Sequence, residues 1–454
     1  MIRQFCRLWT LALVAALLVT ITGCPSKKSV PEASAPAVPA VPLRVAYVGS
    51  DEESRAIERA WAAISDQSLE ITSLPTGAGP AQVAAVSPQN DVLIFPAQQT
   101  GTLQQREALR RLRQGLFQPD DPSEAAGLQG RLLPALERGV MRYGEETVGV
   151  PVGSVQPVLI HQSTSSVSSD LATWEAYSQQ IAELPPGRSA EPLADGWAAL
   201  ALLNRANSYC DANWLFSGEE LRPVLATAPY LRALRELQRD AKHYPSDRMT
   251  PGQVWLAACR GELDLAISWP ATVEGLSTDA DVTLAPLPTS REVFATNSQV
   301  WETPSAEERG EWVFLMGQEP LASLSAGCRQ SSASEVFLKW LTTGEGTASM
   351  RQSVPLFTAT REGTAVGDAS RVSAAYADLL HAQLASNYVR PMLRIPAADQ
   401  YLQALDQAVV AVLTGAKEPE TALIEASEAW EEITIANDRV LQSMHWRKAQ
   451  GLSR

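Results

Sequence analysis

Beyond residue 42, short apolar runs typical of strands alternate with segments in which apolar residues recur at helical spacing. Short apolar runs at residues 43–49, 69–74 and 91–97 predict strands. Between the first two runs, apolar residues recur at helical spacing, and Ser50 with Glu53 forms a capping box at the start of that helix. Strand, helix and strand in this order predict a parallel sheet covered by helices, so we expect an α/β fold.

The rest of the chain continues this alternation and is richer in helix. Extended segments are predicted at residues 147–161 and 282–288, and strands at residues 263–270 and 321–325. Amphipathic spacing predicts further helices at residues 171–184, 195–209, 229–242, 251–261, 334–341, 371–387, 397–414 and 419–435.

The first 23 residues have a different pattern. Arg3 and Arg7 precede an apolar stretch at residues 8–21, which is shorter than the roughly 20 residues that span a bilayer. The stretch ends in small residues before Cys24, and this resembles the lipobox of bacterial lipoproteins. We therefore expect residues 1–23 to be a signal peptide and the Cys24 thiol to carry the lipid anchor. An ordinary secretory signal with an incidental cysteine is the alternative.

Residues 25–42 are rich in Pro, Ala and Ser. Such a segment has too few large apolar residues to form a core and stays extended in water. Residues 24–42 are therefore predicted to tether the folded part to a membrane.

Composition narrows the class of protein. The chain has 454 residues, of which 45% are hydrophobic and 19% charged, which is typical of a globular protein. Its formal net charge of −14 repels nucleic acid, so no nucleic-acid partner is expected. No segment after residue 24 is long and apolar enough to predict a membrane span.

Three cysteines lie in the predicted folded part: Cys210, Cys259 and Cys328. Their spacing does not match a metal site, and an odd number allows at most one disulfide among them. Burial as small side chains is one interpretation. A Cys210–Cys259 disulfide is the other, because an exported protein meets an oxidising compartment.

Catalytic motifs are absent from the sequence. The four histidines form no metal-binding pair, no G-x-S-x-G motif is present, and the glycine-rich segments lack the residues of a nucleotide-binding loop. We therefore expect no catalytic residues, no metal and no cofactor, and the protein is not expected to be an enzyme. An exported hydrolase that uses a carboxylate pair remains the less favoured alternative.

Tryptophan is unusually frequent, with twelve Trp against nine Tyr and eight Phe. Most are expected in the core, and Trp61, Trp174, Trp340 and Trp430 lie at apolar positions of predicted helices. Trp197 lies at a helix start, and Trp269 ends a buried strand before Pro270, where a side chain often faces an opening. An indole face stacks well on the C–H face of a sugar ring. Ordinary packing of both residues is the alternative.

Five sequence patches, taken in order, resemble the extracellular solute-binding proteins of ABC importers, family 1, which include maltose-binding protein. The resemblance covers residues 43 to about 435. The patches are GVPVGSVQPVLIH, PGQVWLAACRGELDLAISWP, VTLAPLPTS, SEVFLKWLTTGEGTASM and PAADQYLQALDQAVVAVLTGAKEPETALIEASEAWEEI.

This resemblance implies a periplasmic-binding-protein-like fold, in which two α/β lobes are joined by hinge strands with a ligand cleft between them. The N-terminal lobe would comprise residues 43–152 plus 283–338. The C-terminal lobe would comprise residues 153–282 plus 339–454. Ligand binding in the cleft would close the lobes by a hinge motion.

The resemblance also implies a function. The protein would capture a small solute, with a carbohydrate expected, and deliver it to the membrane subunits of an ABC permease. It would be a monomeric, membrane-anchored lipoprotein facing the periplasm or the cell exterior, with no cofactor. A non-transport binding or sensor lipoprotein on the same fold is the alternative.

Eight residues are expected to line the cleft and bind the ligand. The sequence departs from the family pattern at two places nearby: His161-Gln162-Ser163 follows the crossover strand, and Thr289 replaces the glycine after Pro288. The eight residues are Ser50, Asp51, Gln98, Gly153, Ser154, Gln156, Trp197 and Trp269.

Overall fold

The computed structural model falls into two units, residues 1–41 and 42–454, and the fold below is that of the second unit. The structure describes residues 41–113, 115–117, 130–163, 171–211, 213–218, 220–276, 280–305, 312–350, 353–363 and 371–452. The predicted signal peptide, Cys24 and the tether up to residue 40 lie outside the described residues. In the described part, no helix combines the length and the apolar character that a bilayer crossing requires.

The first sheet is a mixed sheet with the strand order β2-β1-β3-β17-β4, and β7 pairs with β17 as well. Strand β1 runs parallel to both β2 and β3, as the sequence predicts, while β17 runs antiparallel to β3. Since β17 comes from much later in the chain, the parallel arrangement holds only for the first three strands. The strands are β1 (Leu43–Val48), β2 (Leu69–Leu74), β3 (Val92–Pro96), β4 (Leu109–Arg110), β7 (Val150–Pro151) and β17 (Pro320–Ser325).

Helix α2 (Asp51–Ala62) joins β1 to β2 and begins at the predicted capping box. The Glu53 N–H donates to the Ser50 hydroxyl at 3.2 Å, and the Ser50 N–H donates to the Glu53 carboxylate at 2.7 Å. Trp61 of α2 packs edge to face against Phe337 and Trp340 of α13 (Ser331–Leu341). These rings join two helices that are far apart in the sequence into one apolar cluster.

The second sheet has the order β13-β8-β12-β9. Strand β8 lies between β12 and β13 and is antiparallel to both, whereas β9 is parallel to β12. The strands are β8 (Val158–Gln162), β9 (Ser189–Ala190), β12 (Leu265–Ser268) and β13 (Val282–Ala285). Helices α10 (Pro251–Cys259) and α15 (Arg371–Leu384) pack on this sheet, on β12 and β13 respectively.

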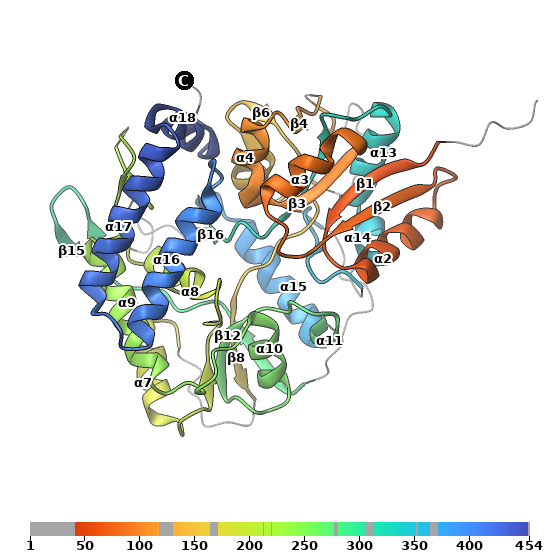
Figure 1. Ribbon diagram of the computed structural model, residues 1–454. Coiled ribbons are helices and arrows are strands. Elements are labelled where there is room, and N and C mark those ends of the chain that lie inside the picture. The colour runs from red at the N-terminus through yellow and green to blue at the C-terminus, as the bar shows by residue number, and fades with distance from the viewer. Residues whose placement is uncertain are drawn as a thin grey trace, which may run out of the picture. The chain divides into compact units, whose positions relative to one another are not determined.

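A group of helices packs beside the second sheet. Helix α16 contacts both α17 and α8, and α9 contacts α8 and α17 (Figure 1). The helices are α7 (Trp174–Glu183), α8 (Ala198–Asn207), α9 (Ala228–Ala241), α16 (Ala398–Leu413), α17 (Pro419–Ala436) and α18 (Arg439–Ala449). The sequence predicts all of these except α18.

Small elements complete the fold. Helices α3 (Pro80–Val86) and α4 (Thr100–Gln105) follow β2 and β3, α6 (Pro134–Leu136) and α11 (Val273–Leu276) are short, and α14 (Gly344–Met350) follows α13. Two-stranded pairs are β5 (Arg142–Tyr143) with β6 (Glu146–Thr147), β10 (Phe216–Ser217) with β11 (Arg222–Pro223), β14 (Val293–Ala295) with β15 (Val300–Glu302), and β16 (Val313–Leu315) with β18 (Val389–Pro391).

The chain passes between the two sheets more than once. Residues 152–157 connect β7 of the first sheet to β8 of the second. After β13 of the second sheet, the chain returns to the first sheet as β17. The fold is therefore a mixed α/β structure in which the first sheet takes strands from two distant stretches of sequence.

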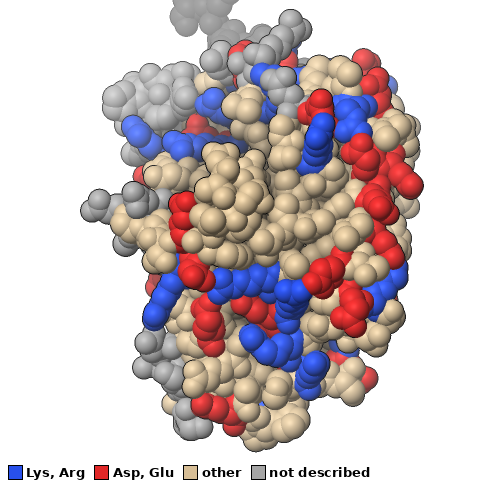
Figure 2. All heavy atoms as spheres, turned by 90° about the vertical axis from the view of Figure 1, so that its left-hand side faces the viewer, with Lys and Arg blue, Asp and Glu red and all other residues tan. Residues whose placement is uncertain are grey.

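Positive and negative side chains are interleaved on the face that carries α9 and α17 (Figure 2). Three arginines of α9 are ion-paired with carboxylates: Arg232 with Glu292 at 2.8 Å, Arg239 with Asp240 at 3.2 Å, and Arg235 with Glu420. Each of these arginines therefore has a carboxylate partner.

The alternative of a Cys210–Cys259 disulfide is wrong for this structure. Cys210 is a free thiol in the core, and burial raises its pKa to about 11. The interpretation of Cys210 as a small buried side chain is the one that holds.

Candidate functional site

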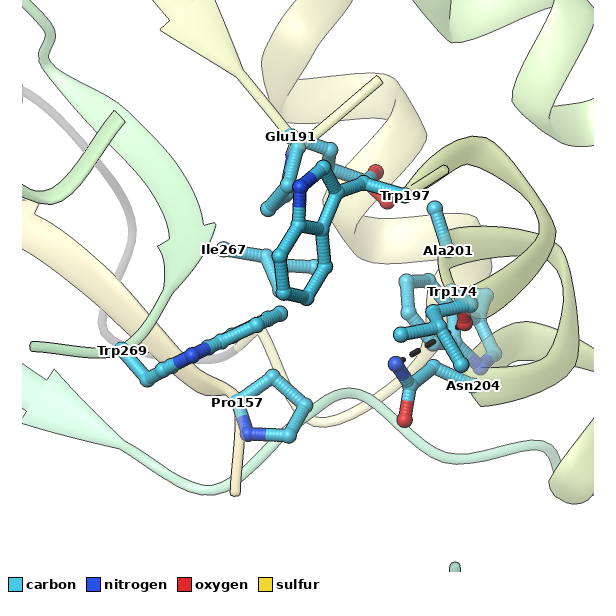
Figure 3. A pocket seen from close by; sticks show the side chains of 10 residues that line it. Pro157, Trp174, Glu191, Trp197, Ala201, Asn204, Ile267 and Trp269 are labelled. Atoms are coloured by element: carbon cyan, nitrogen blue, oxygen red, sulfur yellow. Dashed lines mark hydrogen bonds between the residues drawn. The ribbon is translucent and has the colours of Figure 1, made fainter. Parts of the chain in front are cut away.

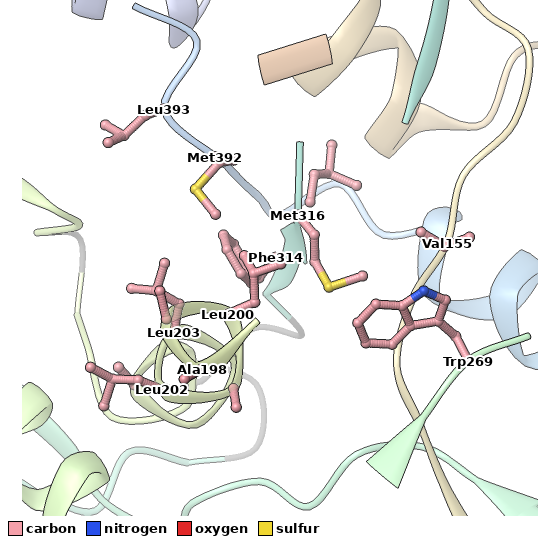
Figure 4. Close-up of a cluster of buried hydrophobic side chains, with 14 of the residues drawn as sticks. Val155, Ala198, Leu200, Leu202, Leu203, Trp269, Phe314, Met316, Met392 and Leu393 are labelled. Atoms are coloured by element: carbon pink, nitrogen blue, oxygen red, sulfur yellow. The ribbon is translucent and has the colours of Figure 1, made fainter. Parts of the chain in front are cut away.

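One continuous hydrophobic core reaches from the first sheet to the second. Between them lies a set of packed side chains, which we call the apolar seam: Val155, Leu200, Trp269, Met316 and Met392. Figure 4 shows Met316 directed towards Val155 and Trp269. The region in which the sequence leads us to expect an open cleft is thus filled by apolar side chains in this structure.

The first turn of α8 lies beside the apolar seam and separates two pockets. Asp406 of α16 caps this turn, because its carboxylate accepts hydrogen bonds from the N–H groups of Gly196 at 2.8 Å and Ala199 at 3.0 Å. Gly196 has a φ of 86°, a conformation that favours glycine. Leu200 contributes to the lining of both pockets.

The first pocket, here called the Trp pocket, contains both tryptophans that the sequence singles out (Figure 3). The rings of Trp197 and Trp269 meet edge to face, with centroids 5.5 Å apart. The free volume is about 10 Å³, which is room for about one water molecule. The lining residues are Pro157, Trp174, Glu191, Pro192, Trp197, Leu200, Ala201, Asn204, Ile267 and Trp269.

The placement of Trp269 differs from the expectation that it faces an opening. Its side chain is only 3% exposed and belongs to the core, because Trp197 of α8 packs over its ring. Trp197, in contrast, is half-buried. The packing alternative therefore describes Trp269 in this conformation, although its ring also forms part of the pocket wall.

A buried charge network lies behind the Trp pocket. The guanidinium of Arg205 donates to Asp240 at 2.8 Å and to Glu191, and all three side chains are at most 3% exposed. Burial alone would lower the pKa of Arg205, but the two carboxylates raise it above its ordinary value. The Tyr244 hydroxyl also donates to Glu191, at 2.6 Å.

The sequence analysis missed this network, although one signal for it exists. Arg205 follows the apolar run at residues 198–203 in α8, where a charged residue is unexpected. A charged residue in a buried helix needs a partner. The partners come from β9 and α9, however, so their identity depends on the tertiary structure.

The second pocket, here called the polar pocket, is larger, with a volume of about 590 Å³. It lies between the loop after β3, the turn before β17, and helices α8 and α16. Amide and carboxylate side chains dominate its wall. The amides both donate to and accept from hydroxyl groups, and the carboxylates accept from them. The lining residues are Gln98, Asp195, Gly196, Ala199, Leu200, Arg248, Gln318, Asp399, Leu402, Gln403, Asp406, Gln407 and Val410.

Gln98 is the expected ligand-binding residue that the structure places in the polar pocket. Its backbone N–H donates to the Gly317 carbonyl at 3.0 Å, which fixes the loop after β3 against the turn before β17. Its Oε1 atom is buried and has no hydrogen-bond partner within the described part of the chain. A buried acceptor of this kind is costly unless a donor reaches it.

Gly153, Ser154 and Gln156 lie on the segment that connects the two sheets. A Cβ at Gly153 would lie 1.8 Å from the Leu356 carbonyl oxygen, so the backbone approach requires glycine. The Tyr376 hydroxyl bonds both the N–H and the carbonyl of Gln156, at 3.1 and 3.0 Å. This segment is therefore held firmly on both sides, and it leads directly to Pro157 of the Trp pocket.

Ser50 and Asp51 are not brought into either pocket. Both are exposed at the start of α2, and the Ser50 hydroxyl is engaged in the helix cap. Of the eight expected residues, Gln98 thus lies in the polar pocket, Trp197 and Trp269 lie in the Trp pocket, and Gly153, Ser154 and Gln156 lie on the connecting segment.

No metal centre is found among the residues that the structure describes, since no three His, Cys, Asp or Glu side chains are grouped to hold one. Comparison with protein-family models gives no match, and comparison with curated protein sequences gives no significant match.

Proposed function

We propose that this chain is a lipid-anchored, extracytoplasmic solute-binding protein that captures a small solute between two α/β lobes and delivers it to an ABC permease. The observation that carries the proposal is the course of the chain, which passes from the first sheet to the second and back. The chain leaves the first sheet after β7, forms the second sheet, and returns as β17. Two sheets between which the chain crosses, here at residues 152–157 and again on the way from β13 to β17, are what a hinge closure needs.

The polar pocket supports a hydroxylated solute, with a carbohydrate as the expected class. Its volume of about 590 Å³ falls within the roughly 300–1,000 Å³ of small-molecule sites. Four glutamine side chains in its wall offer both donors and acceptors: Gln98, Gln318, Gln403 and Gln407. No catalysis, cofactor or metal is part of the proposal.

The apolar seam supports a second candidate, a non-transport binding or sensor lipoprotein on the same fold. Opening the seam would expose side chains such as Met316 and Trp269, and exposure of apolar area costs about 25 cal/mol per Å². A transport protein must reach the open state in every cycle, so exposure of the apolar seam raises the free energy of a state that it needs. A protein that stays closed does not need that state.

Thermal unfolding of the full-length protein in detergent, with a panel of sugars, polyols and amino acids, tests the proposal. We expect at least one solute to raise the unfolding midpoint, because a ligand that binds only the folded state stabilises it. We also expect the protein to co-purify with ABC permease subunits from its own membrane. Absence of any stabilising solute would favour the sensor candidate.

Two glutamines of α16 provide a matched pair of variants. Gln403 lines the polar pocket, whereas Gln400, one turn earlier and also exposed, does not. We expect Gln403→Ala to weaken the affinity for the solute by about tenfold, the scale of one lost hydrogen bond. Gln400→Ala should leave the affinity unchanged, and equal effects of the two variants would place the solute elsewhere.

A further inference from the structure

The Trp pocket combines aromatic rings with a buried carboxylate. Trp174, Trp197 and Trp269 come from three different elements and converge on it (Figure 3). In the described part of the chain, Glu191 is the charged member of the lining, and it is 3% exposed. Indole faces carry negative potential, so this set of groups favours a positive charge.

The charge balance behind the pocket points the same way. Arg205 faces two buried carboxylates, Glu191 and Asp240. Asp240 also accepts from the Ser178 hydroxyl at 2.8 Å, and its further charged partner is Arg239, whose side chain is 56% exposed, so water screens its charge. The buried part of the network therefore keeps an excess of negative charge beside the pocket.

One cation already lies against an aromatic ring of the wall, from the network behind the pocket. The guanidinium of Arg205 lies 4.5 Å from the centroid of the Trp174 ring and 5.6 Å from that of Tyr177. Both distances are within the roughly 6 Å range of a cation–π contact. The same helix, α8, carries Trp197, Ala201 and Asn204 of the pocket lining on the turns before Arg205.

We infer that the Trp pocket, opened by rotation of Trp197, binds an organic cation whose alkylammonium group lies between Trp269 and Glu191. This inference rests on the proposed function, because the ligand would enter where the seam opens. A hydroxylated solute fits the polar pocket instead, so the two pockets select different chemistry.

Trp197 is the side chain that must move. The free volume of about 10 Å³ is too small for an alkylammonium group, and in Figure 3 the Trp197 ring lies between Glu191 and Trp269. Trp197 is half-buried and precedes the helical part of α8, directly after Gly196. Its rotation uncovers both partners without unfolding the helix.

Calorimetry and tryptophan fluorescence on the full-length protein, with choline as the probe, test the inference. The control ligand is 3,3-dimethylbutan-1-ol, which has the shape of choline but no charge. We expect choline to bind with a change in tryptophan fluorescence, and the neutral isostere to bind at least about tenfold more weakly. Equal affinity for the two compounds would overturn the inference. So would the absence of choline binding at 50-fold the concentration that saturates other ligands of the panel, or at about 50 mM if no ligand of the panel binds.

Variants at Trp269 separate ring chemistry from packing. Trp269→Leu and Trp269→Phe both shrink the side chain, but only Phe keeps an aromatic face. We expect Leu to weaken choline binding about tenfold and Phe to weaken it less than about threefold. Trp301→Leu, at a half-buried tryptophan outside the Trp pocket, should leave choline binding unchanged.

The outcomes also distinguish this inference from the proposed function. If a neutral solute stabilises the protein and choline does not bind, the inference is wrong and the proposed function stands. If neither a neutral solute nor choline binds, the inference and the proposed function are both wrong. If Leu and Phe at position 269 weaken choline binding equally, the site does not use the aromatic face and the inference is wrong.

Discussion

The indole rings of Trp197 and Trp269 are in contact, with their planes 61° apart and their centroids separated by 5.5 Å. One ring is half-buried at the start of a helix, and the other is 3% exposed at the end of a buried strand. This contact closes the Trp pocket and forms part of the packing between the two sheets.

The two tryptophans should differ in their contribution to stability. We expect Trp269→Ala to lower the free energy of unfolding by about 3–5 kcal/mol, because it leaves a cavity in the core. Trp197→Ala should cost clearly less, since water can fill part of the vacated space. Urea denaturation of both variants checks this order, and a larger loss for Trp197→Ala would contradict the burial that separates them.

Two buried titratable groups should give opposite pH dependences. Burial raises the pKa of Glu319 from its ordinary value of 4.5 to about 7, although backbone N–H groups of Glu319, Gly317 and Met316, and to a smaller extent Arg394, act against the rise. Burial lowers the pKa of His445 from 6.5 to about 4, and nearby Lys448 adds to the decrease. The Tyr143 hydroxyl lies 2.6 Å from Nδ1 of His445.

The sign of each contribution follows from which state binds more protons. For His445, the unfolded state binds more protons between pH 4 and 6.5, so the free energy of unfolding falls as the pH decreases through this window. For Glu319, the folded state binds more protons between pH 4.5 and 7, so the free energy of unfolding falls as the pH increases.

We therefore expect the two single variants to show opposite slopes. Relative to the native protein, Glu319→Gln should gain up to about 3 kcal/mol of stability as the pH rises from 4.5 to 8. His445→Gln should gain stability, to a similar extent, as the pH falls from 7 to 4. Urea titrations across this range test both, and the double variant should lack both slopes.

Asp406 should stabilise the first turn of α8. It supplies the acceptors for the N–H groups of Gly196 and Ala199, and Trp197, the N-cap residue, makes no side-chain capping bond. We expect Asp406→Ala to lower the free energy of unfolding by about 1–2 kcal/mol, the scale of a lost helix cap. Asp406→Asn, which keeps one oxygen acceptor, should lose less. A loss of equal size in both variants would assign the effect to the charge rather than to the cap.

The anchor prediction concerns a residue outside the described part of the chain. We expect Cys24→Ala to yield a protein that is soluble or keeps its signal peptide, because the lipobox cysteine is then missing. Cell fractionation and metabolic labelling with a fatty acid measure this. Cys6→Ala, within the predicted signal, provides the control and should remain lipidated, whereas lipidation of Cys24→Ala would refute the assignment.

Local elements of this fold were predictable because their signals act over a few residues. The Ser50–Glu53 capping box marks the start of α2, and the apolar run at residues 69–74 coincides with β2. Helix α18 was missed, although Asp438 caps it by accepting from the N–H of Val440 at 3.0 Å. A single Asp before a helix with a mixed pattern is a weak signal, whereas packing against the rest of the fold stabilises such a helix.

The candidate site was predictable only in part. Gln98, Trp197 and Trp269 contribute to pocket walls, but Trp269 is packed in the core instead of facing an opening. Ser50 and Asp51 follow a strand, as Gln98 does, but lie outside both pockets. Which strand end faces a pocket depends on what packs against it.

The sequence by itself determined the longer strands of the two main sheets and most of the helices, since helical period, strand alternation and capping involve residues within about four positions of each other. Tertiary structure alone decided that β17 enters the first sheet antiparallel, that Arg205 meets Glu191 and Asp240, and that Asp406 reaches Gly196, 210 positions away. Such pairs form because buried charges and helix ends must find partners once distant surfaces meet, and no local spacing specifies which surfaces those are.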